Sequence, residues 1–188
     1  SSINTGLTAD STYDSLSNVS KPIDIFDDET VGFTIAETSG TSVTEGGSTD
    51  TFTVVLNSQP TGNVVFNVTS GDTGEATVSP STLTFTTGNW NSAQTVPVTG
   101  VNDGIDDGNV NSTITIAINT GSTADSAYDV LSSQTVTVTT TDDDTAAFTV
   151  TQSGGSTSVT EAGSTDTFTV VLNTQPTGDV VFALTDND

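Results

Sequence analysis

The sequence of 188 residues contains no cysteine and no histidine, and Lys21 is its only basic residue. Without cysteine there is no disulfide framework, and the redox compartment cannot be read from cysteine pairing. The two absences also remove the usual general base, the usual thiolate nucleophile and the softer metal ligands. The acidic residues that remain lie in no predicted apolar pocket, so we do not expect an enzyme.

The near absence of basic residues leaves 24 acidic residues and a formal net charge of −23. Binding of nucleic acid through its backbone depends on Lys and Arg, so it is excluded, and the charge argues against anionic membrane surfaces. No apolar run approaches the length of a membrane span or of a signal-peptide core. We expect no membrane insertion, any export signal to lie outside this stretch, and cations as partners.

Short alternating runs of Val, Ile, Leu and Phe recur along the chain between clusters of Gly, Pro, Asn, Asp and Ser. Disordered acidic chains lack such runs, and a period of two residues is typical of strands with one buried face. Helical periodicity is absent. The spacing predicts an all-β, antiparallel sandwich with strands at residues 31–37 (continuing through 43), 51–57, 63–69, 81–86, 93–101, 112–119 and 134–141.

The chain repeats itself at an interval of about 115 residues. Residues 43–57 return as 159–173 at an offset of 116, and matches between 3–14 and 118–129 have an offset of 115. One interval holds one set of predicted strands, so we expect tandem Ig-like sandwiches. The expected domains are the C-terminal end of a preceding repeat at residues 1–29, a complete repeat at 30–144 and the N-terminal part of a following repeat at 145–188.

Acidic residues occupy turns that the strand order places at one end of the sandwich, because alternate turns share an end when strands reverse at each turn. Calcium takes six to eight oxygens from carboxylates, carbonyls, Asn side chains and water, whereas magnesium prefers fewer protein oxygens. The sequence therefore predicts a calcium site. The alternative is that Asp, Asn and Gly lie there because they tolerate turn dihedrals. The candidate ligands are Glu45, Asp72, Asp103, Asp106, Asp107, Asp142, Asp143 and Asp144.

The opposite end carries the turn around Trp90 and the long loop at residues 120–132. In a tandem array this end lies against the acidic end of the preceding repeat, where residues 27–29 form an earlier acidic triplet. Trp90 is expected to pack against a neighbouring loop, the alternative being a surface that stacks on a sugar. The candidate contacts between repeats are Trp90, Asp125 and Asp129.

Three motifs together resemble the Calx-beta domain, a calcium-binding β-sandwich found in exchanger regulatory regions, integrin tails and very large bacterial surface proteins. They are Val-Thr-Glu-Gly at residues 43–46, Val-Asn-Asp-Gly-Ile-Asp-Asp-Gly at 101–108, and a strand followed by three aspartates at 142–144. The stretch 74–104 is similar to the tandem Calx-beta-like units of bacterial extracellular adhesins and filament proteins. The resemblance covers essentially the whole chain.

The resemblance implies Ca²⁺ as the cofactor and extends the ligand set to the other copies of its motifs: Glu161 for the glutamate, and Asp27, Asp28 and Glu29 for the closing triplet. Asn102 stands where the family has a carboxylate, and the family's Asp-Tyr in the third turn is missing. It therefore implies one or two ions per repeat instead of a larger cluster.

These observations favour a structural protein, namely calcium-rigidified extender repeats of a long secreted or cell-surface adhesin or extracellular filament. The expected partners are neighbouring repeats of the same chain and other copies in a filament. Two alternatives stay open: a carbohydrate- or protein-binding module of a secreted multidomain protein, and a self-assembling filament or surface-layer subunit that pairs through exposed strands. The first would show a strip of exposed aromatic side chains, and the second would show docking between chains.

Overall fold

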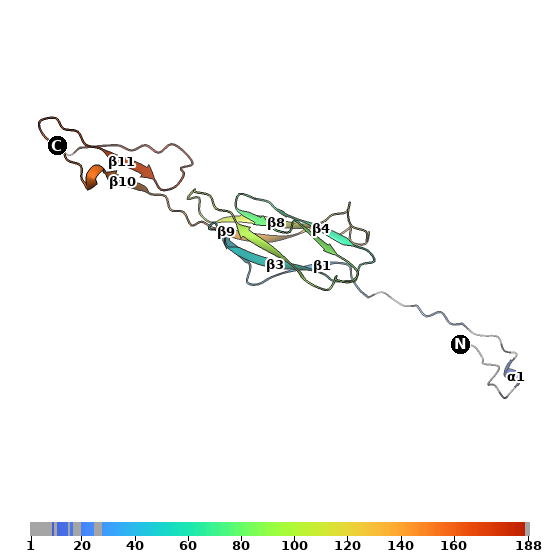
Figure 1. Cartoon of the computed structure of the whole chain (residues 1–188). Coiled ribbons are helices and arrows are strands. Elements are labelled where there is room, and N and C mark those ends of the chain that lie inside the picture. The colour runs from blue at the N-terminus through green and yellow to red at the C-terminus, as the bar shows by residue number, and fades with distance from the viewer. Residues whose placement is uncertain (1–8, 10, 15, 17–19, 25–27, 187–188) are drawn as a thin grey trace.

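A computed structural model describes residues 9, 11–14, 16, 20–24 and 28–186. Their regular structure is almost entirely β, and the helices among them are α1 (Ser11–Asp14) and the single-turn η1 (Ser153–Gly155). A central sandwich lies between an N-terminal segment carrying α1 and a C-terminal pair of strands, β10 (Phe148–Gln152) and β11 (Phe168–Leu172) (Figure 1). No described helix is long and apolar enough to cross a membrane.

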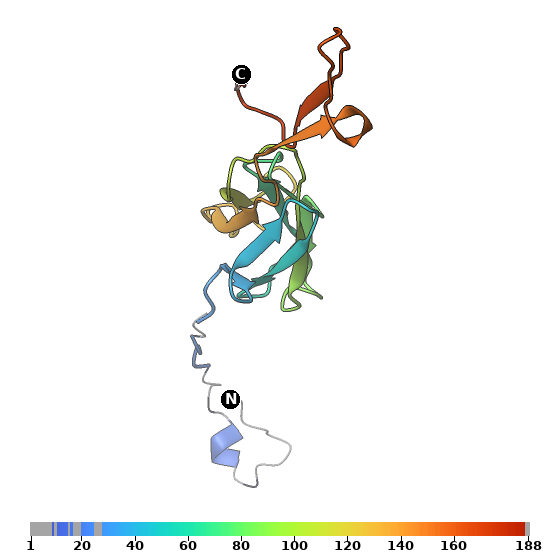
Figure 2. The same ribbon diagram turned by 90° about the vertical axis from the view of Figure 1, so that its left-hand side faces the viewer.

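Two sheets form the sandwich (Figure 2). One sheet has the order β1-β3-β7-β5 and is antiparallel throughout. Its strands are β1 (Phe33–Glu37), β3 (Thr49–Leu56), β7 (Gln94–Gly100) and β5 (Ala76–Val78). The other has the order β2-β9-β8-β4-β6, in which only β2 and β9 are parallel. Its strands are β2 (Thr41–Thr44), β9 (Gln134–Thr141), β8 (Val110–Ile118), β4 (Val64–Ser70) and β6 (Thr82–Phe85).

The alternation in the strands decides which side chains fill the space between the sheets. In β9 the side chains of Val136, Val138 and Thr140 are buried, and the threonines between them are more exposed. Phe66 of β4 packs edge-on against Phe33, with ring centroids 4.8 Å apart. The predicted all-β antiparallel sandwich is thus confirmed, and the two-residue period reflects burial on one face of each strand.

The predicted first strand divides into two strands that belong to different sheets. Ser39 and Gly40 both have positive φ angles, 69° and 86°, and this conformation interrupts the extended backbone after β1. β1 pairs with β3, whereas β2 crosses over and pairs with β9. The sequence prediction missed this switch, and it also missed β5, whose three residues are too few to display a period.

The pairing of β2 with β9 defines the end of the sandwich at which the acidic residues lie. Thr44 is the register partner of Thr141, so the residues that follow them, Glu45 and Asp142, leave the two strands side by side. The Glu45 N–H donates to the Thr141 carbonyl oxygen over 3.1 Å. β5 begins at the same end, directly after Glu75.

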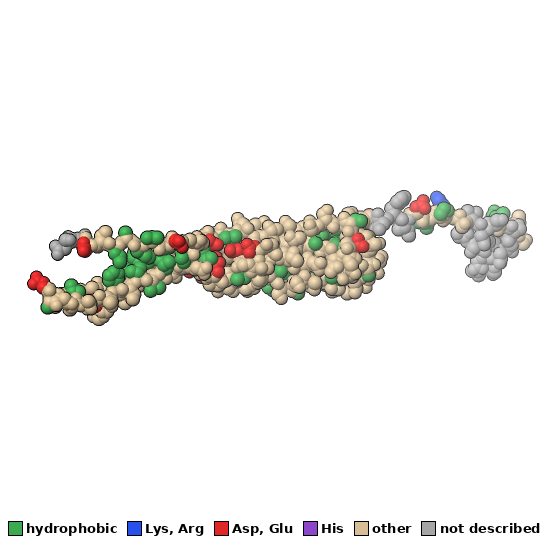
Figure 3. All heavy atoms as spheres, turned by 90° about the horizontal axis from the view of Figure 1, so that it is seen from above, with side chains coloured by type: hydrophobic (Ala, Val, Ile, Leu, Met, Phe, Trp, Pro, Cys, Tyr) green, Lys and Arg blue, Asp and Glu red, His purple; other side chains and the backbone are tan. Residues whose placement is uncertain are grey.

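The strands β10 and β11 repeat β1 and β3 in register but not in burial. Phe148 is paired with Leu172 as Phe33 is paired with Leu56. However, the side chain of Phe148 is 55% exposed, against 5% for Phe33, which the second sheet covers. Figure 3 shows the resulting band of apolar side chains along the C-terminal strands. This pair of strands therefore presents an uncovered apolar face.

Candidate metal centre

Two buried glutamates form the centre of the acidic end. Glu45 follows β2 and is 1% exposed, and Glu75 precedes β5 and is 7% exposed. Among the described residues, the Oε2 atom of each is buried without a hydrogen-bond partner. A buried charged oxygen that forms no hydrogen bond is costly, so these two carboxylates require either a proton or a cation.

Three aspartates surround these glutamates in two groups that share Glu45. In the first group, carboxylate oxygens of Glu45, Glu75 and Asp107 all lie within 4.8 Å of one another. In the second, those of Glu45, Asp103 and Asp144 do so. The four connections after β2, before β5, after β7 and after β9 thus direct oxygens to one place.

No basic side chain balances these charges. The only basic residue, Lys21, is exposed on the N-terminal segment, and Figure 3 shows the acidic side chains gathered where the sandwich meets the C-terminal strands. Burial first, and then the negative charges of Asp142, Asp103, Asp107 and Glu75 in that order, together raise the pKa of Glu45 from 4.5 to about 7. Burial likewise raises the pKa of Glu75, with added repulsion from Asp107. Full ionisation of the carboxylic acids at this end of the sandwich is therefore unfavourable.

The three aspartates that follow β9, residues 142–144, lie in three different environments. Asp142 accepts hydrogen bonds from the backbone N–H groups of Asp144 (2.8 Å) and Gly108 (2.7 Å), which lower its pKa and tie the chain exit to the turn after β7. Asp144 lies in the second group, and its pKa is raised by burial and then by the charge of Asp143. Asp143 is exposed and lies in neither group.

Three predicted ligands are engaged in backbone contacts. Asp72 is exposed and accepts from the Gly74 N–H (3.0 Å). Asp106 accepts from the Ala146 N–H (2.7 Å), beyond the chain exit. Both lie outside the two groups. Asp103 accepts from the Ile105 N–H (2.8 Å) and still contributes an oxygen to the second group.

Glu75 is the ligand candidate that sequence reasoning missed. The prediction placed Asp72 in this part of the centre because it treated residues 70–80 as a turn. Once β5 is recognised, Glu75 is the acidic residue directly before a strand at the acidic end. The signal was therefore the short alternating triplet at 76–78, together with the glutamate that precedes it.

The other copies of the ligand motifs are not assembled into a comparable group among the described residues. Asp27 lies outside the part of the chain that the structure describes. Asp28 and Glu29 are exposed, and Glu161 is exposed in the turn after residues 157–160. Neither group of acidic oxygens includes them.

The three residues predicted to form contacts between repeats lie in loops of the central sandwich. Asp125 is buried and accepts from the Thr61 N–H (2.7 Å), a bond that is the main cause of its lowered pKa. Trp90 packs on the core, and the Oδ1 atom of Asp129 is buried. Trp90 and Asp125 also line a cavity of about 440 Å³ together with Glu29. Their contact with a neighbouring repeat stays a prediction.

No protein-family model matches the chain, and no curated protein matches its sequence. Several solved structures resemble it at low similarity. The surface layer protein SbsC, domains 1–6, is 24% identical over 81% of this chain and 24% of that chain, with a TM-score of 0.40. The E. coli chaperone DraB is 8% identical over 60% of this chain and 56% of that chain, with a TM-score of 0.43.

A PapD-like domain of human CEP192 is 13% identical over 70% of this chain and 97% of that chain, with a TM-score of 0.41. At TM-scores this low the likenesses carry no inference about function. The strand pairing described above establishes the sandwich by itself, and the functional argument rests on the acidic end.

Proposed function

We propose that this chain is a structural, non-catalytic segment of a long extracellular protein built from tandem Calx-beta-like sandwiches, and that calcium stabilises its acidic end. The observation that supports this most directly is the pair of buried glutamates, whose Oε2 atoms find no hydrogen-bond partner among the described residues. They face three aspartates in a chain whose only basic residue lies elsewhere. A bound cation supplies the missing positive charge.

The geometry of the two groups fits calcium. Oxygens on opposite sides of a calcium ion lie about 4.6 to 5.2 Å apart, because each Ca–O distance is about 2.3 to 2.6 Å. The carboxylate oxygens of each group lie within 4.8 Å of one another, and Glu45 belongs to both. Glu75 and Asp107 would hold one ion and Asp103 and Asp144 a second, with Glu45 bridging them. This agrees with the one or two ions that the resemblance implies.

The local structure supports a tandem organisation with repeats at residues 1–29, 30–144 and 145–188. The Thr160 N–H donates to Ser164 Oγ over 2.7 Å, as the Thr44 N–H donates to Ser48 Oγ over 2.7 Å. The Asn173 N–H bonds to the Ala147 carbonyl oxygen (2.8 Å), as Asn57 bonds to Gly32 (2.9 Å). Segments about 115 residues apart thus fold alike locally, as successive repeats of one design do.

Calcium would act on two levels in such an array. An ion that binds the folded sandwich and not the unfolded chain stabilises it by mass action. Asp144, in the second group, is followed after three residues by β10, so an ion there would also fix the direction in which the chain leaves the sandwich. The function proposed is therefore a rigid spacer, and millimolar calcium outside cells suits modules that bind calcium at about 10⁻⁴ to 10⁻³ M.

Thermal melting in calcium and in chelator tests this function. Calcium at a hundredfold excess over its Kd stabilises by about 2.7 kcal/mol, which raises the Tm of a domain of this size by on the order of 10 °C. Magnesium at the same concentration serves as the ionic-strength control and should give a smaller rise. Equal melting temperatures in calcium and in chelator would exclude the proposed role.

A further inference from the structure

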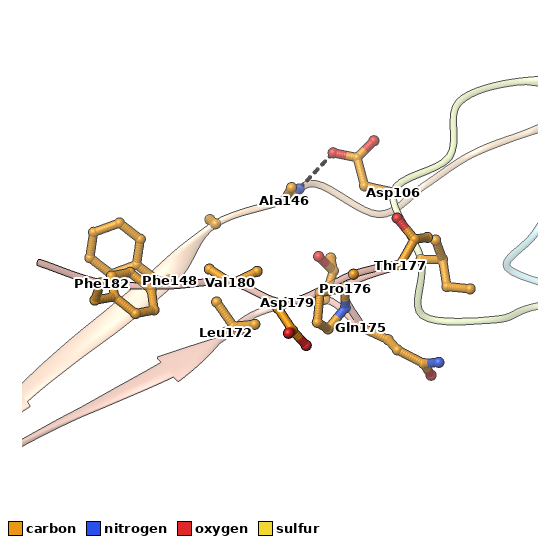
Figure 4. A pocket seen from close by; sticks show the side chains of 14 residues that line it. Asp106, Ala146, Phe148, Leu172, Gln175, Pro176, Thr177, Asp179, Val180 and Phe182 are labelled. Carbon is orange, nitrogen blue, oxygen red and sulfur yellow. Dashed lines mark hydrogen bonds between the residues drawn. The ribbon is translucent and has the colours of Figure 1, made fainter.

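The turn between β7 and β8 contacts the segment that follows the sandwich. The Ala146 N–H donates to a carboxylate oxygen of Asp106 over 2.7 Å (Figure 4), and the Gln175 N–H donates to the Gly104 carbonyl oxygen over 2.6 Å. Ala146 lies shortly before β10, and Gln175 lies shortly after β11. One turn of the complete sandwich therefore holds both strands of the following pair by their ends.

Ile105 adds an apolar side chain between these two hydrogen bonds. It is half-buried, whereas Asp106 beside it is exposed. Ile105 lines the same cavity as Gln175 and Pro176 of the following segment. Three consecutive residues thus present a backbone carbonyl, an apolar side chain and a carboxylate to that segment. We call these residues, 104–106, the docking tripeptide.

The residues that receive the docking tripeptide have counterparts in the complete sandwich. Gln175 lies in Asn-Thr-Gln-Pro-Thr-Gly at residues 173–178, and the related sequence Asn-Ser-Gln-Pro-Thr-Gly occupies residues 57–62. Four of the residues that line the cavity at the joint are Ala146, Thr174, Gln175 and Thr177, and their counterparts line one cavity in the complete sandwich: Val31, Ser58, Gln59 and Thr61. The receiving surface is thus a feature of the repeat itself.

The docking tripeptide is separate from the proposed calcium centre. Asp106 lies outside both groups of carboxylate oxygens, although the sequence predicted it as a ligand. Asp144 belongs to the second group and lies in the connection from β9 to β10. The joint therefore has two different restraints. An ion would act on the connecting chain, whereas the hydrogen bonds from Ala146 and Gln175 act at the ends of the strands.

We propose that the docking tripeptide of each repeat binds the repeat that follows it in the same chain and fixes the angle between the two without a metal ion. This inference rests on the tandem organisation proposed above and does not rest on calcium. Asp106 is then a positioning residue of the joint. Because its hydrogen bond involves a charged acceptor, losing the bond should lower the ratio of docked to undocked joints by on the order of tenfold.

Two variants remove this hydrogen bond from opposite sides. Asp106→Ala removes the acceptor, and Ala146→Pro removes the N–H donor while every carboxylate stays in place. Asp72→Ala is the control for the first variant, because Asp72 is an exposed acid outside both groups that accepts from the Gly74 N–H. Ala147→Pro is the control for the second, because it adds the same ring where the N–H donates no hydrogen bond to any described residue.

Distance measurement between two spin labels by pulsed electron paramagnetic resonance, in calcium and in chelator, is the test. The chain has no cysteine, so Thr113→Cys on β8 and Thr151→Cys on β10, both at exposed positions, provide unique attachment sites. The labelled parent chain and both controls should give a narrow distribution in either solution. Asp106→Ala and Ala146→Pro should each broaden it in both solutions. The double variant should be no broader than the broader single variant, because both changes remove one bond.

Three outcomes would overturn this proposal: variants whose distances match the parent chain, controls that broaden the distribution as much as the variants, or a double variant in which the two effects add. Calcium titration of Asp106→Ala provides a further check, because a loss of calcium binding would make Asp106 a ligand and not a positioning residue. If the parent chain bound no calcium, the proposed calcium centre would fail, and the distances in chelator would still decide whether the docking tripeptide holds the joint.

Discussion

Glu45 and Glu75 should affect the stability of the sandwich in opposite directions with and without a cation. In the absence of a cation, each buried carboxylate is repelled by its acidic neighbours, and burial raises both pKa values. With a cation, the same oxygens become ligands, and the repulsion is replaced by attraction. Variants of these residues should therefore change stability in opposite directions under the two conditions.

Glu75→Gln keeps the shape of the side chain and removes its charge. In chelator at about pH 8 we expect it to stabilise the sandwich by about 1 kcal/mol, or roughly 3 to 6 °C in Tm, because one buried like charge is lost. In calcium we expect most of the wild-type gain to disappear, since the first group loses a ligand. Asp24→Asn, which removes one charge from the N-terminal segment, is the control. A variant that keeps the full calcium gain would show that Glu75 is not a ligand.

The raised pKa of Glu45 predicts how stability depends on pH. Its pKa is about 7 in the folded protein and near 4.5 in its ordinary state, so between these values the folded chain holds more protons than the unfolded chain. In chelator, the free energy of unfolding should therefore fall as pH rises through this window and level off above it. In calcium, the gain should instead grow with pH, because the ion competes with the proton.

Melting experiments from about pH 5 to about pH 8 in chelator and in calcium check this prediction. The difference in stability between the calcium series and the chelator series should increase as pH rises. Parallel curves would mean that the proton and the ion do not compete for the buried carboxylates. The lowered pKa of Asp142 does not interfere, because its stabilising effect is lost only when pH falls below the ordinary range of an aspartate.

Among the elements, β2 holds the centre in place through its contact with β7. A Cβ atom added at Gly100 in β7 would lie 2.1 Å from the carbonyl oxygen of Thr44, the residue before Glu45. Gly100→Ala should therefore push β2 away, cost about 1 to 3 kcal/mol of stability and weaken calcium binding. Gly88→Ala is the control, because a Cβ there would have only an ordinary contact at 3.9 Å. A Gly100→Ala variant with unchanged melting and binding would contradict this account of β2.

The C-terminal strands should contribute little to the stability of the sandwich. Two hydrogen bonds between described residues link this segment to the sandwich, one from the Ala146 N–H to the Asp106 carboxylate and one from the Gln175 N–H to the Gly104 carbonyl oxygen, while Phe148 and Val171 are more than half exposed. We expect a chain that ends at residue 145 to keep its Tm within about 3 °C and its calcium response, which corresponds to a change well under 1 kcal/mol. A large drop in Tm would place the domain boundary beyond residue 144.

The strands were predictable because burial on one face produces alternation, which a sequence displays directly. β5 and the switch between β1 and β2 were not, since they depend on three residues and on two positive φ angles. Strand order also placed Glu45 and the residues after β7 and β9 at one end. It could not show that Asp142 binds backbone N–H groups while Asp144 enters a group of carboxylates, because the path of the chain exit decides this.

For the whole molecule, the acidic end lies at the joint between the sandwich and the C-terminal strands. X-ray scattering should show a narrower distribution of lengths in calcium than in chelator if the ion fixes the chain exit. Asp144→Asn should abolish this difference, whereas Asp143→Asn should preserve it, because only Asp144 belongs to a group. Equal effects of the two variants would mean that the joint responds to charge in general and not to a defined site.

The most direct test of the proposed centre is a calcium titration by calorimetry at about pH 8, above the pKa of about 7 that burial and the neighbouring negative charges give Glu45. The wild-type chain should bind calcium saturably, with no more than two ions attributable to the two groups. The double variant Glu45→Gln, Glu75→Gln should lose this binding while remaining folded. A wild-type chain without saturable binding, or a double variant that binds calcium equally well, would contradict the account.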